Sequence, residues 1–193
     1  GLGTMYVTAV TAGSKVSMFL CCPFDAMGCT MATYGGQNVG AAKWERLHQG
    51  MRACVILGAA YSLLALGVLL LFSEPLSMLF LDAGSVSLLP LARQYLITGA
   101  AFFFPLALVN IFRFMIQGMG FSPLATLAGV LEMIGRAALA FLVPTLGFTV
   151  ACFASPAAWI LADLFLVPAY FHCCRRLSSP ARDKRKLMAA VKG

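Results

Sequence analysis

The sequence of residues 53–73 is ACVILGAAYSLLALGVLLLFS, which is 21 consecutive residues without a charged side chain. About 20 apolar residues in an α-helix cross the ~30 Å hydrocarbon core of a bilayer, because the helix rises about 1.5 Å per residue. This stretch therefore predicts a transmembrane helix. We expect the chain to be an integral membrane protein.

The composition supports the same class of protein. Of the 193 residues, 61% are hydrophobic and 11% are charged, whereas roughly 25% are charged in an ordinary soluble domain. The net charge is +7, but seven of the 14 Lys and Arg residues follow Phe171. A basic segment behind an apolar one is typical of the cytoplasmic end of a last membrane helix, so we expect no nucleic-acid binding.

Apolar windows divided by charges, Gly and Pro predict five membrane spans. The spans cover residues 16–37, 52–72, 95–117, 122–144 and 150–173. The expected fold class is all-α, a polytopic membrane helix bundle. We expect its parts to be the end of a truncated helix in residues 1–13, a helical lobe over residues 14–177 and a basic tail over residues 178–193.

The positive residues predict the orientation of these spans. With the tail in the cytoplasm, ten of the 14 Lys and Arg residues lie on that side, whereas only Lys15 and Arg93 lie on the other. The positive-inside rule therefore predicts a multi-pass protein of the cell membrane with a cytoplasmic C-terminus. Residues 1–13 are too short to cross a membrane and carry neither an initiating Met nor a signal peptide, so we expect the chain to lack helices upstream.

Three carboxylates, Asp25, Glu132 and Asp163, lie within two residues of the midpoints of their predicted spans. A charged group near the bilayer centre costs roughly 2.5–3.5 kcal/mol on insertion scales, so each one needs a reason. Carboxylates at that depth can bind a proton or a small cation and couple its release to a conformational change. We predict that these three residues are cation-coupling or substrate-binding sites.

Two arginines also lie within the spans. Arg136 is four residues after Glu132, the spacing at which opposite charges meet on one helix face. The pair is either structural or part of a cation site, and the sequence does not decide between the two. Arg113 lies near the cytoplasmic end of its span, where a snorkelling anchor is favoured over a substrate contact.

The remaining polar residues of the spans are uncharged, and we expect them to bridge helices or to contact a substrate. They are Tyr34, Gln37, Asn38, Asn110 and Gln117. The sequence contains no phosphate-binding loop, nucleophile–base pair or metal-ligand spacing. We therefore expect no enzymatic activity and no cofactor; whether a metal binds is left open.

Several motifs together resemble one transporter family. Residues 32–41, ATYGGQNVGA, end in a Gln-Asn-x-Gly-Ala element before a basic loop. This element, preceded by PFDAMG at residues 23–28, is similar to the second helix of either lobe of multidrug and toxic compound extrusion (MATE) transporters. The motifs Gln117-Gly118-x-Gly120, Leu131-Glu132-x-x-Gly135-Arg136 and Pro156-Ala157-Ala158-Trp159 follow in a similar order. The resemblance covers nearly the whole chain.

The resemblance implies twelve helices in two lobes, which expel organic-cation drugs and xenobiotics in exchange for Na⁺ or H⁺. This chain would supply the C-terminal lobe, with membrane lipid, small organic cations and the missing N-terminal lobe as its partners. One branch of the family carries cation-binding acids in its seventh and tenth helices. The span 95–117 contains no Asp or Glu, so those sites cannot be carried over, and the coupling ion stays open.

Two other functions remain possible from the sequence. A flippase for lipid-linked oligosaccharides, from the same superfamily, would need a larger and more cationic cavity. A non-transporting membrane scaffold subunit would need only the apolar spans, and carboxylates at mid-bilayer depth would then serve no purpose.

Overall fold

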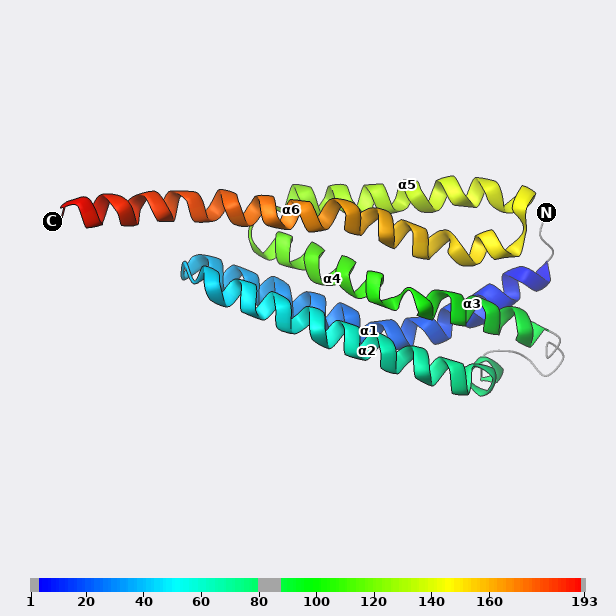
Figure 1. Ribbon diagram of the computed structural model, residues 1–193. Coiled ribbons are helices and arrows are strands. Elements are labelled where there is room, and N and C mark those ends of the chain that lie inside the picture. The colour runs from blue at the N-terminus through cyan, green and yellow to red at the C-terminus, as the bar shows by residue number, and fades with distance from the viewer. Residues whose placement is uncertain (1–3, 80–87, 192–193) are drawn as a thin grey trace.

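The computed structural model describes residues 4–79 and 88–191. Over these residues the chain folds into six α-helices and contains no strand (Figure 1). The helices are α1 (Thr4–Gly40), α2 (Trp44–Met78), α3 (Leu89–Ala101), α4 (Phe103–Gly118), α5 (Ser122–Leu146) and α6 (Phe148–Val191). The predicted all-α bundle is confirmed.

Five passes through a membrane fit these helices. Four of them, in α1, α2, α5 and α6, are long and apolar enough to cross a bilayer on their own. Helices α3 and α4 make up a fifth when taken as one span that is bent by 51°. The predicted number of spans is therefore matched, with one span broken in two.

The break lies at Phe102, three residues before Pro105. Proline has no backbone N–H, so it cannot donate to the carbonyl of Ala101 one helical turn earlier. The chain tightens here, and the Phe102 amide donates to the Gly99 carbonyl oxygen at 3.0 Å. The interruption of the predicted span 95–117 follows from this local change.

Two of the predicted boundaries between parts of the chain lie inside continuous helices. Residues 4–13 continue directly into the predicted span 16–37 as part of α1, and residues 178–191 continue α6. Gly13 lies within α1, where a Cβ would come 2.7 Å from the Tyr95 ring of α3. The missing side chain therefore lets α3 approach the first turns of α1 without interrupting the helix.

A tight turn joins α4 to α5, as the glycines around it predict. Gly120 has a φ of +93°, a conformation that favours glycine, and its amide donates to the Gln117 carbonyl oxygen at 3.0 Å. The Phe121 amide donates to the Ile116 carbonyl oxygen at 3.1 Å. These two bonds form a Schellman motif, which ends α4 and turns the chain back along it.

Gly118, the last residue of α4, allows the closest approach between helices in this region. A Cβ at Gly118 would lie 2.1 Å from the backbone oxygen of Ala32 in α1. We expect Gly118→Ala to destabilise the protein by about 1–3 kcal/mol, because backbone atoms would have to separate. Thermal unfolding in detergent measures this loss, with Gly67→Ala as the control.

A Cβ at Gly67 would meet nothing within 4 Å. Alanine is favoured over glycine in a helix by about 1 kcal/mol, so the control should be neutral or stabilising. Equal melting temperatures for Gly118→Ala and the unchanged protein would contradict the tight contact.

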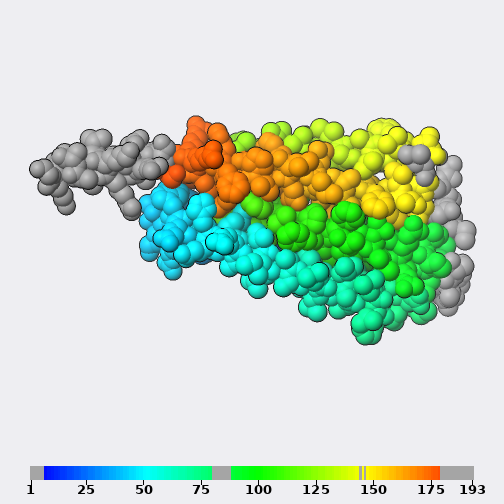
Figure 2. All heavy atoms as spheres, viewed as in Figure 1, coloured from blue at the N-terminus to red at the C-terminus, as the bar shows by residue number. Residues whose placement is uncertain are grey.

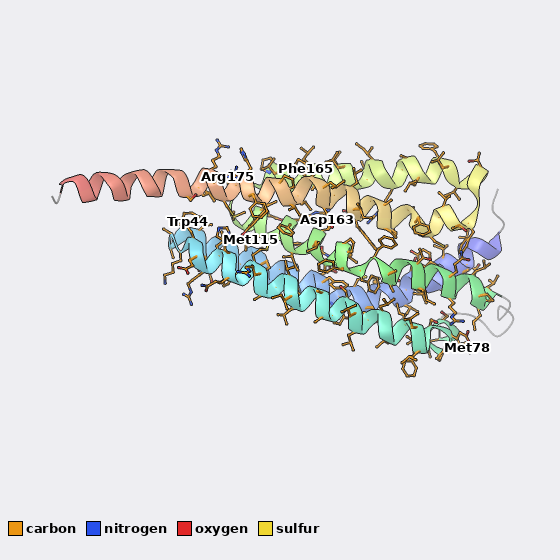
Figure 3. The ribbon with its side chains drawn as sticks, viewed as in Figure 1. Trp44, Met78, Met115, Asp163, Phe165 and Arg175 are labelled. Atoms are coloured by element: carbon orange, nitrogen blue, oxygen red, sulfur yellow. The ribbon has the colours of Figure 1, made fainter. Side chains whose placement is uncertain are left out.

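Helix α4 occupies the centre of the bundle and packs against α1, α2, α5 and α6. The α1–α2 turn and the C-terminal part of α6 lie at one end of the molecule, whereas the α5–α6 turn lies at the other (Figure 1). Trp44 and Arg175 mark the first end, and Met78 marks the second (Figure 3). The basic α1–α2 connection thus shares an end with the basic part of α6, as the predicted orientation requires.

Candidate functional site

Glu132 is the centre of a charge cluster between α4, α5 and α6. Its residue exposure is only 9%. Arg113 of α4 donates from Nη2 to Glu132 Oε2, and Arg136 of α5 donates from Nη2 to Glu132 Oε1. Each carboxylate oxygen therefore has its own arginine.

Small residues allow the helices to close around this carboxylate. Ala125 and Ala128 of α5 are buried on the same helix face as Glu132, at spacings of seven and four residues. A Cβ at Gly135 would lie 3.5 Å from the Cα of Ala158 in α6. Such close packing limits the exposure of Glu132, which strengthens its electrostatic attraction to the arginines.

The preferred interpretation of Arg113 as a snorkelling anchor is wrong. Its side chain is 24% exposed and turns inward to Glu132 instead of reaching the end of the bundle. Its Nε is buried and has no hydrogen-bond partner among the described residues. The cause is packing between helices. Helix α4 is packed on several sides, and α5 brings the buried carboxylate of Glu132 within ion-pair distance of Arg113.

Asp163 of α6 joins the cluster as a second acid. It interacts electrostatically with both Arg113 and Glu132, and Figure 3 shows it where α6 passes α4. Its Oδ1 is buried and has no partner within the described part of the chain. A buried carboxylate oxygen without a hydrogen-bond partner is energetically unfavourable. A proton or a small cation bound to Asp163 would satisfy this oxygen.

A cavity of about 430 Å³ borders the cluster. Arg136 lines it from α5, Trp159 from α6, and Ser14 and Tyr95 from α1 and α3. The Trp159 Nε1 donor is buried without a partner among the residues that the structure describes. Trp159 is not among the site residues predicted from the sequence, although it lies four residues before Asp163 and hence one helical turn away.

Asp25 does not join the cluster. It lies on an exposed face of α1, together with Lys15 and Cys22. The three carboxylates therefore divide into Glu132 and Asp163, which belong to the cluster, and Asp25, which is exposed and lies apart from it.

The MatE family model matches residues 1–142, which is most of the chain. The chain belongs to the MATE family.

A solved structure described as a MATE in the bent conformation has a TM-score of 0.76 to this chain and covers 86% of it, with 22% sequence identity. This similarity shows that the chain has a MATE fold. The chain spans 37% of the length of that structure. No individual curated protein matches the sequence.

Membership of the MATE family makes the chain part of a multi-pass membrane protein of a transporter family, not of an enzyme family. The motif that suggested this family lies at the end of α1. There the Asn38 amide donates to the Tyr34 carbonyl oxygen at 2.8 Å, and the Tyr34 hydroxyl donates to the Arg46 carbonyl oxygen at 2.7 Å. These bonds fix the α1–α2 turn, so Tyr34 and Asn38 have structural contacts.

The other uncharged polar candidates lie apart from each other. Asn110 is buried in α4, one turn before Arg113, whereas Gln37 and Gln117 are exposed at the end of the bundle that carries the α1–α2 turn. Of these three residues, only Asn110 is placed close to the charge cluster.

Proposed function

We propose that the protein is an antiporter that exports organic-cation drugs and other xenobiotics by alternating access, driven by Na⁺ or H⁺. Membership of the MATE family supports transport as the general activity. The observation that carries the proposal further is Asp163, a mid-span carboxylate with a buried oxygen that has no partner among the described residues. The transporting molecule is the full-length protein, of which this chain forms the C-terminal lobe.

In this proposal Asp163 binds the coupling cation. While Asp163 is charged, Arg113 is attracted to two carboxylates, one on α5 and one on α6. When a proton or Na⁺ neutralises Asp163, Arg113 is attracted to Glu132 alone. The balance of forces between α4 and α6 then changes, which is the differential interaction that any ion-driven conformational change requires.

The bend between α3 and α4 supports a movement of this kind. The 51° break at Phe102 lies about three turns before Arg113 in the same predicted span. Bent helices can absorb small rotations at their break, and alternating access uses such rocking of one bundle against another. We therefore propose that α4 transmits the change at Asp163 to the rest of the lobe.

The exposed face of α1 is the proposed substrate-facing surface. Asp25 lies at mid-span on this face, and exposure of its charge to lipid would be unfavourable by several kcal/mol. Carboxylates at this depth normally face a protein interior or a water-filled cavity. Asp25 is therefore proposed to line the cavity of the full-length transporter and to attract cationic substrates.

The charge balance favours an exporter over the two alternatives. Both intramembrane arginines are paired with Glu132, which leaves little free positive charge for the anionic headgroup of a lipid-linked oligosaccharide. A scaffold subunit would gain nothing from the unpartnered oxygen of Asp163. We propose the cell membrane as the location, with the C-terminus in the cytoplasm, because Arg175 lies at the same end of the bundle as Trp44, which follows Lys43 (Figure 3).

Ethidium efflux from a drug-sensitive host tests the proposal. Cells that express the full-length protein should extrude ethidium faster than cells with an empty vector. Collapse of the Na⁺ or the H⁺ gradient should abolish this difference in efflux rate. Asp25→Asn should raise the KM for ethidium about tenfold, because loss of a charged partner costs about 1.5 kcal/mol.

Glu45→Gln is the control, since Glu45 is an exposed acid in the first turn of α2, outside the predicted spans. It should leave the KM unchanged. If no gradient drives ethidium export, the exporter proposal fails. If the protein exports ethidium but Asp25→Asn behaves like Glu45→Gln, only the role of Asp25 fails.

A further inference from the structure

A groove of about 580 Å³ opens on one side of the bundle, and no residue of the charge cluster lines it. Helices α2 and α6 form its walls, and α4 contributes Phe112 to its floor. Among the described residues α2 and α6 meet at few points, one of which is the contact of His48 with Tyr170, while both helices pack against α4. Figure 2 views this side, with α4 in green visible between α2 and α6.

The rim of the groove carries two side chains with free hydrogen-bonding capacity. His48 and Arg52 are four residues apart on α2 and thus lie on the same helix face. The Tyr170 hydroxyl is 3.1 Å from His48 Nδ1 and orients the ring, while Nε2 has no partner among the described residues. Arg52 is exposed and makes no ion pair within the described ranges.

The rest of the groove is apolar. Val55 and Ile56 continue the α2 wall from Arg52 toward the middle of the bundle, and Phe171 faces them from α6. Among the side chains that the structure describes, no acid lines the groove, and Glu45, about one turn before His48, lies outside it. The groove therefore has a cationic head and an apolar body.

The cationic and apolar parts of the groove lie in the order expected from the predicted orientation of the bundle in the membrane. His48 and Arg52 belong to the first turns of α2, at the end of the bundle marked by Trp44 and Arg175 (Figure 3). Beyond Ile56, which is 67% exposed, the outer face of α2 continues with Leu63 and Leu64. A phosphate at the rim would thus lie at headgroup level with an apolar surface directly beneath it.

We propose that this groove is a binding site for one anionic phospholipid. Its phosphate is held by Arg52 and His48, and one acyl chain lies along Val55, Ile56 and Phe171. A free phosphate ion would leave the apolar walls uncovered, and a zwitterionic lipid would bring a second cation to a rim that has no acid to receive it. An anionic lipid satisfies both parts of the groove. This site is separate from the proposed transport function, and its test requires no transport.

Native mass spectrometry tests the proposal on the full-length protein. The protein is released from vesicles that contain equal amounts of phosphatidylglycerol and phosphatidylcholine, and the ratio of the two retained lipids is measured. We expect retention of phosphatidylglycerol in excess. Arg52→Gln should lower the ratio about fivefold, the effect of roughly 1 kcal/mol for one basic residue near a membrane surface. His48→Gln should lower it as well.

Two variants control for general effects of charge. Arg46→Gln removes an exposed arginine from the same helix end, but Arg46 does not line the groove, so the ratio should not change. Arg52→Lys keeps the charge and should keep the preference. Equal retention of both lipids by the unchanged protein overturns the proposal, as does a loss with Arg46→Gln or Arg52→Lys equal to that with Arg52→Gln.

Competition with excess inorganic phosphate distinguishes a lipid headgroup from a free phosphate ion as the ligand of the groove. It should not displace the bound phosphatidylglycerol, because the acyl chain contributes to binding through the apolar walls. Displacement of the lipid by inorganic phosphate would identify a plain phosphate site and would overturn the lipid assignment.

Discussion

Asp163→Asn should reduce ethidium export to the level of cells with an empty vector, under a Na⁺ gradient and under a H⁺ gradient alike. Asparagine has nearly the same shape as aspartate but can neither take up a proton nor carry the charge that holds Na⁺. Arg113 would keep its contact with Glu132, so the helices should remain packed. We therefore expect a folded protein that has lost its driving force.

The control for Asp163→Asn is a second measurement on the same variant. Ethidium binding to the purified protein should persist, since Asp25, the proposed substrate contact, lies on α1 and outside the cluster. Loss of export with retained binding separates coupling from substrate recognition. Export by the variant at the normal rate under either gradient would contradict the assignment of Asp163 as the coupling residue. The proposal that the unchanged protein exports ethidium would not be affected.

The sequence predicts the depth of the charged residues along their spans, but it does not predict the side of the helix that they occupy. Asp25, Glu132 and Asp163 are all predicted at mid-span, yet only the last two interact with the same arginine, Arg113. Position along a span sets the height of a side chain in the membrane. Which face of the helix is covered depends on packing between helices, and Asp25 lies on a face that no described helix covers.

The sequence predicts contacts within one helix, but it does not predict contacts between helices. The pair of Glu132 with Arg136 follows from a spacing of four residues and is present in the structure. The second partner, Arg113, comes from a different helix, and its sequence position near the end of a span favoured the wrong interpretation. Trp159 was overlooked for a similar reason, since its unpartnered Nε1 is visible only once α6 is packed.

Glu132→Gln should destabilise the protein by about 3 kcal/mol or more, the lower part of the range for breaking one partner out of a buried ion pair. Arg113, with a side chain only 24% exposed, would lose its closest counter-ion and retain only the attraction of Asp163. Arg136 contributes less, because its side chain is 49% exposed and solvent screens its charge. Chemical or thermal unfolding in detergent measures the change.

Glu74→Gln provides a matched control for this prediction. Glu74 pairs with Arg93 at 3.3 Å, but both side chains are about half exposed, at 52% and 48%. Loss of such a surface pair should cost about 1 kcal/mol or less. If Glu132→Gln costs no more than Glu74→Gln, the cluster does not stabilise the fold.

We therefore expect loss of the two carboxylates to have different effects, and the measurements answer whether the i,i+4 pair is structural or part of a cation site. Glu132 has both oxygens occupied by arginines, so its loss should appear first in stability. Asp163 has a buried oxygen with no partner among the described residues, so its loss should appear in transport and spare the fold. A structural pair then lies beside a cation site, and Arg113 connects the two, because it is the side chain that interacts with both acids. If Glu132→Gln instead left stability unchanged and abolished export, Glu132 would itself belong to the cation site.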